Sequence, residues 1–244
     1  IYFQGEPMIH PKLIDFISYA EKAKIFTSIS TNAHFINEKS AENLVKSGLS
    51  RVVVSLDGMT QETYEQYRIH GDITKVFKGI QYIQEAKKRL KSSYPIIQVQ
   101  YLVVAPNEHE IDLASQYVKD HRIDELVFKT AQIYDYHNGS PLIPSNSKFS
   151  RYKKKLDGTY EIKNQLENQC WRLWKGAVIT WDGKVLPCCF DKDAQYEMGN
   201  ISENSFKKIW NNKKYQSFRY QLLNNRKNID ICQNCSEGTK IFEN

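Results

Sequence analysis

Alternation between strand-like and helix-like segments over the first 132 residues restricts the fold of this chain more than any other feature. Short runs rich in apolar and β-branched residues are each followed by a segment with apolar residues at helical spacing. We expect strands at residues 1–4, 25–32, 51–57, 96–104 and 125–132, and helices at residues 11–23, 37–47, 60–67, 73–90 and 107–121. This order predicts parallel βαβ units joined by right-handed connections.

Polar residues follow the expected strands at the points where the strands end. They are Gly5-Glu6, Thr31-Asn32, Ser55 with Asp57, Asn107, and Lys129-Thr130. In parallel α/β sheets, ligands bind at the carboxyl ends of the strands. Any one of these residues could be only a helix cap or a turn former, because Asn and Asp often take that role. Together they indicate a ligand site at this edge of the sheet.

All five cysteines lie in the last third of the chain, at positions 170, 188, 189, 232 and 235. Cys232 and Cys235 form a Cys-x-x-Cys pair. Cys188 follows residues 176–187, which are typical of a β-hairpin around the turn signal Asp182-Gly183. The odd number of cysteines and the lack of a visible secretory signal argue against disulfides and favour metal ligation.

Four thiolates can hold either a structural zinc ion or an iron–sulfur cluster. Zinc ribbons usually present two Cys-x-x-Cys pairs and this chain has one, so the spacing favours a cluster slightly and leaves zinc open. Cys188 and Cys189 are adjacent, and neighbours on a strand point to opposite faces. We therefore expect only one of these two to join Cys170, Cys232 and Cys235 at a metal centre.

Composition and charge exclude several classes of protein. The net charge of +6 is mild for 244 residues and the lysines are scattered, which argues against nucleic acid as a partner. No run approaches the ~18 apolar residues of a membrane helix, so we expect no membrane partner. We expect a strand–helix domain at residues 1–132, a polar connector at residues 133–165, and a cysteine-bearing domain at residues 166–244 that includes a helix at 205–223.

Two motifs resemble those of a known enzyme family. Gly183 to Cys188 has the form Gly-x4-Cys, preceded by Cys170 and followed by the distal pair, which resembles the auxiliary-cluster region of radical SAM enzymes of the SPASM or twitch type. Gln4-Gly5-Glu6-Pro7 resembles the Gly-Gly-Glu-Pro motif of the same family, whose backbone and Glu receive the amino group of S-adenosylmethionine (SAM). Residues 30–32 and 54–58 resemble the next two strand ends of that family.

This resemblance implies a fold and a set of cofactor sites. The fold would be α/β, an incomplete parallel (β/α) barrel of the radical SAM type followed by a small β-hairpin plus helix domain that binds a cluster. It implies a SAM site and an auxiliary [4Fe–4S] cluster, and it selects Cys188 over Cys189. The implied SAM-binding residues are Gly5, Glu6, Pro7, Asn32, Ser55 and Asp57, and the implied cluster ligands are Cys170, Cys188, Cys232 and Cys235.

The resemblance also implies an activity. A radical SAM oxidoreductase or maturase uses a 5′-deoxyadenosyl radical to abstract hydrogen from a peptide or small-molecule substrate, and the auxiliary cluster would accept or relay an electron. An electron donor such as flavodoxin or ferredoxin and a cytoplasmic location go with this activity. No side chain stands out as a catalytic acid or base.

The chain departs from the family pattern at its start. The family binds its radical-generating [4Fe–4S] cluster through Cys-x3-Cys-x2-Cys after the first strand, and this motif does not occur in the 244 residues. We therefore expect the chain to be a fragment, inactive by itself, with this second cluster held by a missing N-terminal segment. The alternative is a non-catalytic binding module with a structural four-cysteine zinc site.

Overall fold

The protein, described here by a computed structural model covering residues 4–163 and 165–235, divides into two compact units. The first unit is Ile1–Ala131 with Pro141–Phe149, and the second is Gln132–Ser140 with Ser150–Asn244. Residues 141–149 belong to the first unit, and residues 132–140 and 150–163 belong to the second. The expected domains at residues 1–132 and 166–244 and the expected connector at 133–165 remain predictions.

The first unit is built on a parallel sheet of four strands in the order β1-β2-β3-β4. These are β1 (Ser28–Thr31), β2 (Arg51–Ser55), β3 (Ile96–Val103) and β4 (Glu125–Thr130). The register places Thr31 beside Val54 and Ser55 beside Gln100, so β1 and β2 end at nearly the same level while β3 continues to Val103. Of the expected strand 1–4, only Gln4 lies within the described residues, and it is in a bend.

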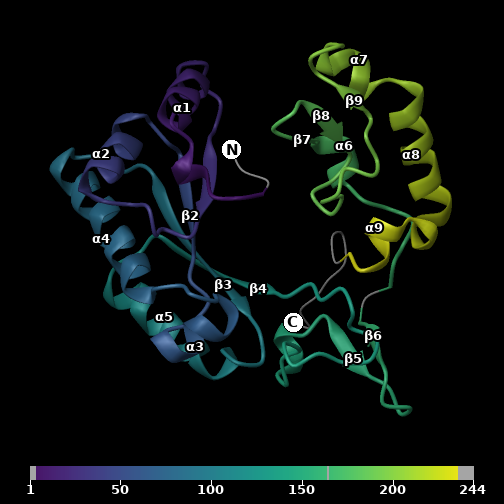
Figure 1. The fold of residues 1–244 in the computed structure, drawn as a ribbon, viewed down its shortest axis with the longest axis horizontal. Coiled ribbons are helices and arrows are strands. Elements are labelled where there is room, and N and C mark those ends of the chain that lie inside the picture. Colours follow the sequence, from purple (N-terminus) through teal and green to yellow (C-terminus); the bar gives the residue numbers. More distant parts are fainter. Residues whose placement is uncertain (1–3, 164, 236–244) are drawn as a thin grey trace. The chain divides into compact units, whose positions relative to one another are not determined.

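Helices follow β1, β2 and β3, as the alternation predicts. Figure 1 shows α2, α4 and α5 together along one side of the sheet. The helical segments of this unit are η1 (Pro7–Ile9), α1 (Leu13–Lys22), α2 (Glu38–Lys46), α3 (Gln61–Tyr67), α4 (Ile73–Arg89), η2 (Glu108–Glu110), α5 (Ile111–Asp120) and η3 (Ser147–Phe149).

Two apolar clusters lie in the first unit, and the larger one holds helices against the sheet. Ile17 of α1, Val54 of β2, Ile80 of α4 and Val99 of β3 are all buried in it. Each fully buried side chain of this size contributes about 1.5–3 kcal/mol relative to an exposed one. The β-branched run of β2 is buried at its three central residues, 52–54, as expected for a strand covered on both faces.

The second unit contains short strands and helices around its own apolar cluster. Its sheets are a hairpin, β5 (Tyr152–Lys154) with β6 (Tyr160–Ile162), and an antiparallel group, β7 (Val178–Ile179), β8 (Lys184–Leu186) and β9 (Gly199–Asn200). The expected hairpin at 176–187 is confirmed as β7 and β8. The helical segments are α6 (Arg172–Lys175), α7 (Phe206–Trp210), α8 (Lys213–Asn225), η4 (Arg226–Asn228) and α9 (Asp230–Gln233).

The expected helix at 205–223 is wrong in one respect, because it is two helices. α7 ends at Trp210 and α8 begins at Lys213. The break arises at Asn212, whose extended backbone and side-chain oxygen cap α8 by accepting the Tyr215 amide at 2.8 Å. Asn competes well for such capping positions, and the apolar spacing across the break still resembles one continuous helix.

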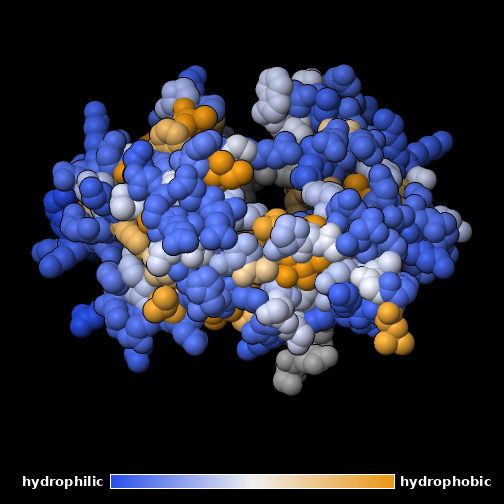
Figure 2. Space-filling model, turned by 60° about the horizontal axis from the view of Figure 1, so that its bottom comes forward, coloured by the Kyte–Doolittle hydropathy of each residue, from blue (hydrophilic) through white to orange (hydrophobic). Residues whose placement is uncertain are grey.

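One face of the molecule is largely polar. On the face shown in Figure 2, hydrophilic side chains predominate and apolar ones form small separate groups. Among the described residues, no helix has the length and apolar character that crossing a membrane requires.

Candidate functional site

Glu6 ties the N-terminal segment to the end of β1. Its carboxylate accepts the Thr31 hydroxyl at 2.7 Å and the Asn32 amide at 2.8 Å. It also caps η1 by accepting the Met8 amide at 3.0 Å, and Pro7 occupies the first position of that turn, where its missing N–H is not needed. An ionised carboxylate can accept about four hydrogen bonds, so this half-buried group retains capacity for a further donor such as an ammonium.

Gly5 and Asn32 lie on either side of this carboxylate. Gly5 has a φ of +82°, a conformation that favours glycine, and it is exposed. The Asn32 side chain accepts the His34 amide at 2.9 Å, which turns the chain away from β1. The following residue, Ala33, is approached closely by α4, because a side chain at Gly79 would lie 2.9 Å from the Ala33 carbonyl oxygen.

Asp57 makes a buried ion pair after β2. Its side chain is 1% exposed, and one oxygen lies 2.6 Å from both the Nε and an Nη of Arg68. The other oxygen accepts the Leu102 amide of β3 at 2.8 Å. Burial raises the pKa of Asp57 above its ordinary value, against the opposing effects of Arg68 and the Leu102 hydrogen bond. Asp57 thus joins β2, β3 and α3 from within the unit.

Asn107 is a second polar residue at the strand ends that holds the backbone. Its amide nitrogen donates to the carbonyls of Asp57 and Leu102, at 2.9 Å each, and its amide oxygen accepts the Val104 amide at 2.8 Å. The side chain is fully buried. Its role in the structure is to close the turn after β3 onto the loop after β2.

The predicted SAM-binding residues therefore divide by environment. The structure brings Glu6 and Asn32 into direct contact, with Gly5 and Pro7 adjoining them in sequence. Ser55 is half-buried at the last position of β2. Asp57 is directed into the protein. The SAM contacts of all six remain predictions, and Glu6 has the geometry most suited to one.

The four cysteines predicted as ligands come from three places in the second unit. Cys170 immediately precedes the first turn of α6, Cys188 follows β8, and Cys232 and Cys235 lie in and directly after α9. All are free thiols; Cys232 and Cys235 are buried, and Cys170 and Cys188 are half-buried. Cys170 and Cys232 share the apolar cluster of the unit.

These thiols are close enough to influence one another electrostatically. Burial and then the neighbouring Cys235 raise the pKa of Cys232 to about 12, with a further contribution from Cys170. A hydrogen bond with Cys189 and burial raise the pKa of Cys188, and Cys235 contributes here too. Cys188 and Cys232 are therefore both within reach of Cys235, which brings all four predicted ligands into one neighbourhood.

The residues of this neighbourhood fit an iron–sulfur cluster in their chemistry. Four free thiols are the ligand set of a [4Fe–4S] centre, which forms when they deprotonate. Tyr215 is fully buried, and its hydroxyl has no hydrogen-bond partner among the described residues. Burial raises the pKa of Tyr215 to about 12, and Cys188 adds to this rise. In the described parts of the chain, no three His, Cys, Asp or Glu side chains stand in coordination geometry, so metal binding would draw the sulfurs together.

Cys189 differs from Cys188 for a reason other than the one expected. Strand alternation does not separate them, because β8 ends at Leu186 and both cysteines lie in the chain that follows. Cys189 is exposed and Cys188 is half-buried. Cys188 is also held by the turn, where its sulfur accepts the Phe190 amide at 3.5 Å. The choice of Cys188 as ligand remains a prediction.

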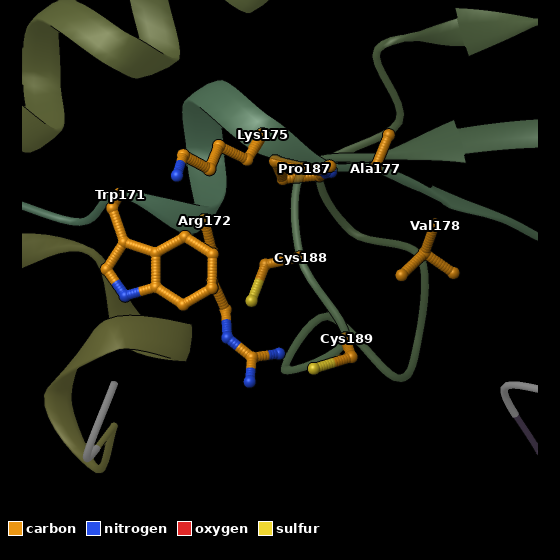
Figure 3. Close-up of a pocket in the computed structure, with 9 residues that line it drawn as sticks. Trp171, Arg172, Lys175, Ala177, Val178, Pro187, Cys188 and Cys189 are labelled. Carbon is orange, nitrogen blue, oxygen red and sulfur yellow. The ribbon is translucent and has the colours of Figure 1, made fainter. Parts of the chain in front are cut away.

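A pocket of about 310 Å³ opens beside these two cysteines. Figure 3 shows both sulfur atoms on the side of the pocket where Arg172 lies. The guanidinium of Arg172 and the ammonium of Lys175 each lie 5.5 Å from the Trp171 ring centroid. The pocket thus combines open space at Cys188 with two cations and an aromatic ring.

Several residues that build these sites escaped prediction from the sequence. Thr31 was recognised only as part of a strand end, and Arg68 and Arg226 carried no motif. Arg68 pairs with Asp57 across 11 positions, and Arg226 contacts residues 57 to 59 positions away. Contacts at such separations leave no local pattern, because they depend on how distant segments pack.

Comparison with known proteins identifies two segments of the chain. The sequence profile of the Radical SAM superfamily matches residues 1–101. The profile of an iron-sulfur cluster-binding domain, SPASM, matches residues 170–236. The second match contains all five cysteines.

Individual relatives agree with these profiles. The tungsten-containing aldehyde ferredoxin oxidoreductase cofactor-modifying protein of Pyrococcus furiosus is 25% identical over 97% of this chain and 73% of its own length. The S-adenosyl-L-methionine-dependent 2-deoxy-scyllo-inosamine dehydrogenase of Niallia circulans is 44% identical over 61 residues, 25% of this chain and 24% of that protein. Among solved structures, native anSMEcpe with bound AdoMet and Kp18Cys peptide shares the fold, with a TM-score of 0.56, 16% identity, and coverage of 88% of this chain and 68% of that chain.

Proposed function

We propose, from the match of residues 1–101 to the radical SAM superfamily profile and of residues 170–236 to the SPASM profile, that the chain is the SAM-positioning and auxiliary-cluster part of a radical SAM oxidoreductase or maturase. The observation that carries the proposal is that three separate segments of the second unit contribute four buried or half-buried cysteines, all within the residues that match the SPASM profile.

Cys170, Cys188, Cys232 and Cys235 would hold an auxiliary [4Fe–4S] cluster. SAM and the iron–sulfur clusters supply hydrogen abstraction from an unreactive C–H bond and an acceptor or relay for the resulting electron. The protein provides the ligands and a low-dielectric environment, since Leu173, Val185 and other apolar residues of the second unit surround Cys232. Four protein ligands leave no iron open to substrate, which fits electron transfer better than substrate binding.

Glu6 would orient SAM at the end of β1. Its carboxylate is held by the Thr31 hydroxyl and the Asn32 amide, so it is fixed before the ligand arrives. A fixed carboxylate with remaining acceptor capacity suits the ammonium of the methionine part of SAM. Gly5 exposes its backbone beside it, and Ser55 and Asn32 stand at neighbouring strand ends.

The substrate would be a peptide or a small molecule. The Niallia relative is named as a dehydrogenase of a small cyclic compound, and the anSMEcpe structure holds a peptide. We further propose an electron donor such as flavodoxin or ferredoxin, and a cytoplasmic location, because free clustered thiols persist in reducing compartments.

Iron content of two matched variants tests the cluster assignment. Wild type, Cys188→Ala and Cys189→Ala are purified and reconstituted anaerobically with iron and sulfide, and iron and sulfide per chain are measured. Wild type and Cys189→Ala should each hold about four irons and four sulfides, as a [4Fe–4S] centre requires. Cys188→Ala should hold much less, although it removes the same thiol from the adjacent position.

Two results would contradict this proposal. Colourless wild-type protein that retains one zinc ion per chain would favour a non-catalytic module with a structural four-cysteine zinc site. Equal iron loss in both alanine variants would mean that the turn, not the Cys188 sulfur, is what matters.

A further inference from the structure

Arg226 is the largest fully buried side chain among the described residues, with 1% exposure. It opens η4, the short turn between α8 and α9, and α9 carries Cys232. A buried guanidinium cannot lose its charge at any ordinary pH, so its burial is costly unless negative charge lies nearby.

Arg226 forms hydrogen bonds with the backbone directly before Cys170. Its guanidinium donates to the carbonyl of Gln169 at 2.7 Å and to that of Glu167 at 3.3 Å. Its backbone amide donates to the Asn168 side chain at 2.9 Å, and the same Asn168 donates back to the Asn224 carbonyl at 2.9 Å. Residues 167–169 are thereby fastened to η4.

The same side chain reaches the distal cysteines. Arg226 hydrogen-bonds the thiol of Cys232, with the guanidinium as donor. Ile229, at the end of η4, is buried with Cys232 and Leu173 in one apolar cluster. One residue therefore connects the segment that ends in Cys170 with the segment that contains Cys232.

We propose that Arg226 is the positioning residue and counter-charge of the auxiliary cluster, holding the segments of Cys170 and Cys232 together and raising the reduction potential of the bound cluster. This inference rests on the proposed function. Four thiolates carry more negative charge than an oxidised or reduced iron–sulfide core can neutralise, so the ligated cluster is an anion. The reduced cluster is the more negative form, and a buried cation beside it stabilises that form preferentially. Net charge and hydrogen bonds to sulfur are established controls of cluster potential.

Three variants of the full 244-residue chain separate charge from shape. Arg226→Gln retains N–H donors for the carbonyls but removes the charge. Arg226→Lys retains the charge but lacks the planar fork. Lys227→Gln removes the same charge at the adjacent exposed position and is the matched control. After anaerobic reconstitution, iron per chain and the midpoint potential, followed by electron paramagnetic resonance, are measured for each.

Arg226→Gln should shift the equilibrium toward the oxidised cluster about tenfold, which is about 59 mV lower for a one-electron couple. If it instead fails to retain iron, Arg226→Lys should still retain it. Lys227→Gln should match wild type in both measurements. Wild-type iron content and midpoint in Arg226→Gln would overturn the inference, as would equal iron loss in Arg226→Gln and Arg226→Lys. Wild-type protein that binds no iron would overturn the proposed function itself.

Discussion

Replacing Arg68 by methionine tests how the loop after β2 is held in place. The carboxylate of Asp57 is 1% exposed, whereas the side chain of Arg68 is 36% exposed. Without Arg68, the carboxylate would remain buried with only the Leu102 amide as a partner. Methionine retains much of the aliphatic volume of arginine, so the change mainly removes the charge and the hydrogen bonds.

The two partners of this pair should not be equivalent. Breaking a buried ion pair costs about 3–5 kcal/mol, and the exposure of Arg68 places Arg68→Met near the lower end, at about 3 kcal/mol at neutral pH. Asp57→Asn should cost only about 1 kcal/mol, because the amide oxygen can still accept the Leu102 N–H and Arg68 can turn toward solvent. Arg89→Met, at a more exposed pair with Glu42, should cost less than 1 kcal/mol.

Urea unfolding can assign the effect to the correct unit. All four tryptophans, at 171, 174, 181 and 210, belong to the second unit, and most of the helical residues belong to the first. Arg68→Met should lower the midpoint of the transition seen by far-UV circular dichroism by roughly 1–3 M, since m is about 1–3 kcal/mol/M for small domains. The transition seen by tryptophan fluorescence should stay in place.

The pH dependence of this variant follows from the sign of the pKa shift. Burial raises the pKa of Asp57 in the folded protein above its value in the unfolded chain, so the folded state binds more protons. The free-energy cost of burying the Asp57 carboxyl therefore falls as the pH falls toward the raised pKa. Loss of Arg68 removes an effect that lowers the pKa, and the defect of Arg68→Met should therefore shrink in acid. The reasoning would be refuted if Asp57→Asn were as destabilising as Arg68→Met, or if the Arg68→Met defect grew in acid.

Three further predictions concern single side chains. Glu6→Gln should weaken SAM binding to this chain about tenfold in calorimetry, because a hydrogen bond to a charged group contributes about 1.5–3 kcal/mol; an unchanged Kd would remove Glu6 from the SAM site. Tyr215→Phe removes a buried hydroxyl that has no hydrogen-bond partner among the described residues. The substitution should therefore stabilise the metal-free protein by about 1 kcal/mol, measured by fluorescence-detected unfolding. A clear loss of stability would contradict this expectation. Burial raises the pKa of Glu21, but hydrogen bonds from Ser50 and Thr27 outweigh this effect and leave the pKa below 4.5. Glu21→Gln should therefore be less stable than wild type above about pH 4.5, and the difference in stability should vanish as the pH falls further. A difference of equal size at pH 7 and pH 3 would speak against these hydrogen bonds.

Local signals account for most of the fold that could be predicted. The β-branched residues of β2 and the apolar residues at helical spacing in α2 and α4 place their elements within a few positions, because strand and helix preferences act over short stretches of chain. The sequence does not indicate the break between α7 and α8, because the apolar spacing typical of one helix continues across Asn212.

The candidate sites were predictable as residue types and less so as environments. Glu6 contacts Asn32 at the end of β1, where the sequence predicts a ligand site. Asp57, also at a strand end, is instead buried against Arg68. The exposure of Cys189 and the half-burial of Cys188 come from the turn after β8, where the sequence predicts a strand.

The amino-acid sequence by itself determined the parallel strand–helix order, the hairpin before Cys188 and the set of thiols available for a cluster, because each depends on residues close together in the chain. The tertiary structure alone decided which polar groups are left to meet a ligand. Glu6 can still accept a hydrogen bond, whereas the Asp57 carboxylate is already engaged by Arg68 and the Leu102 amide. Arg226 is buried between the segments of Cys170 and Cys232. Such outcomes depend on burial and on contacts between distant segments, and both exist only once the chain has packed.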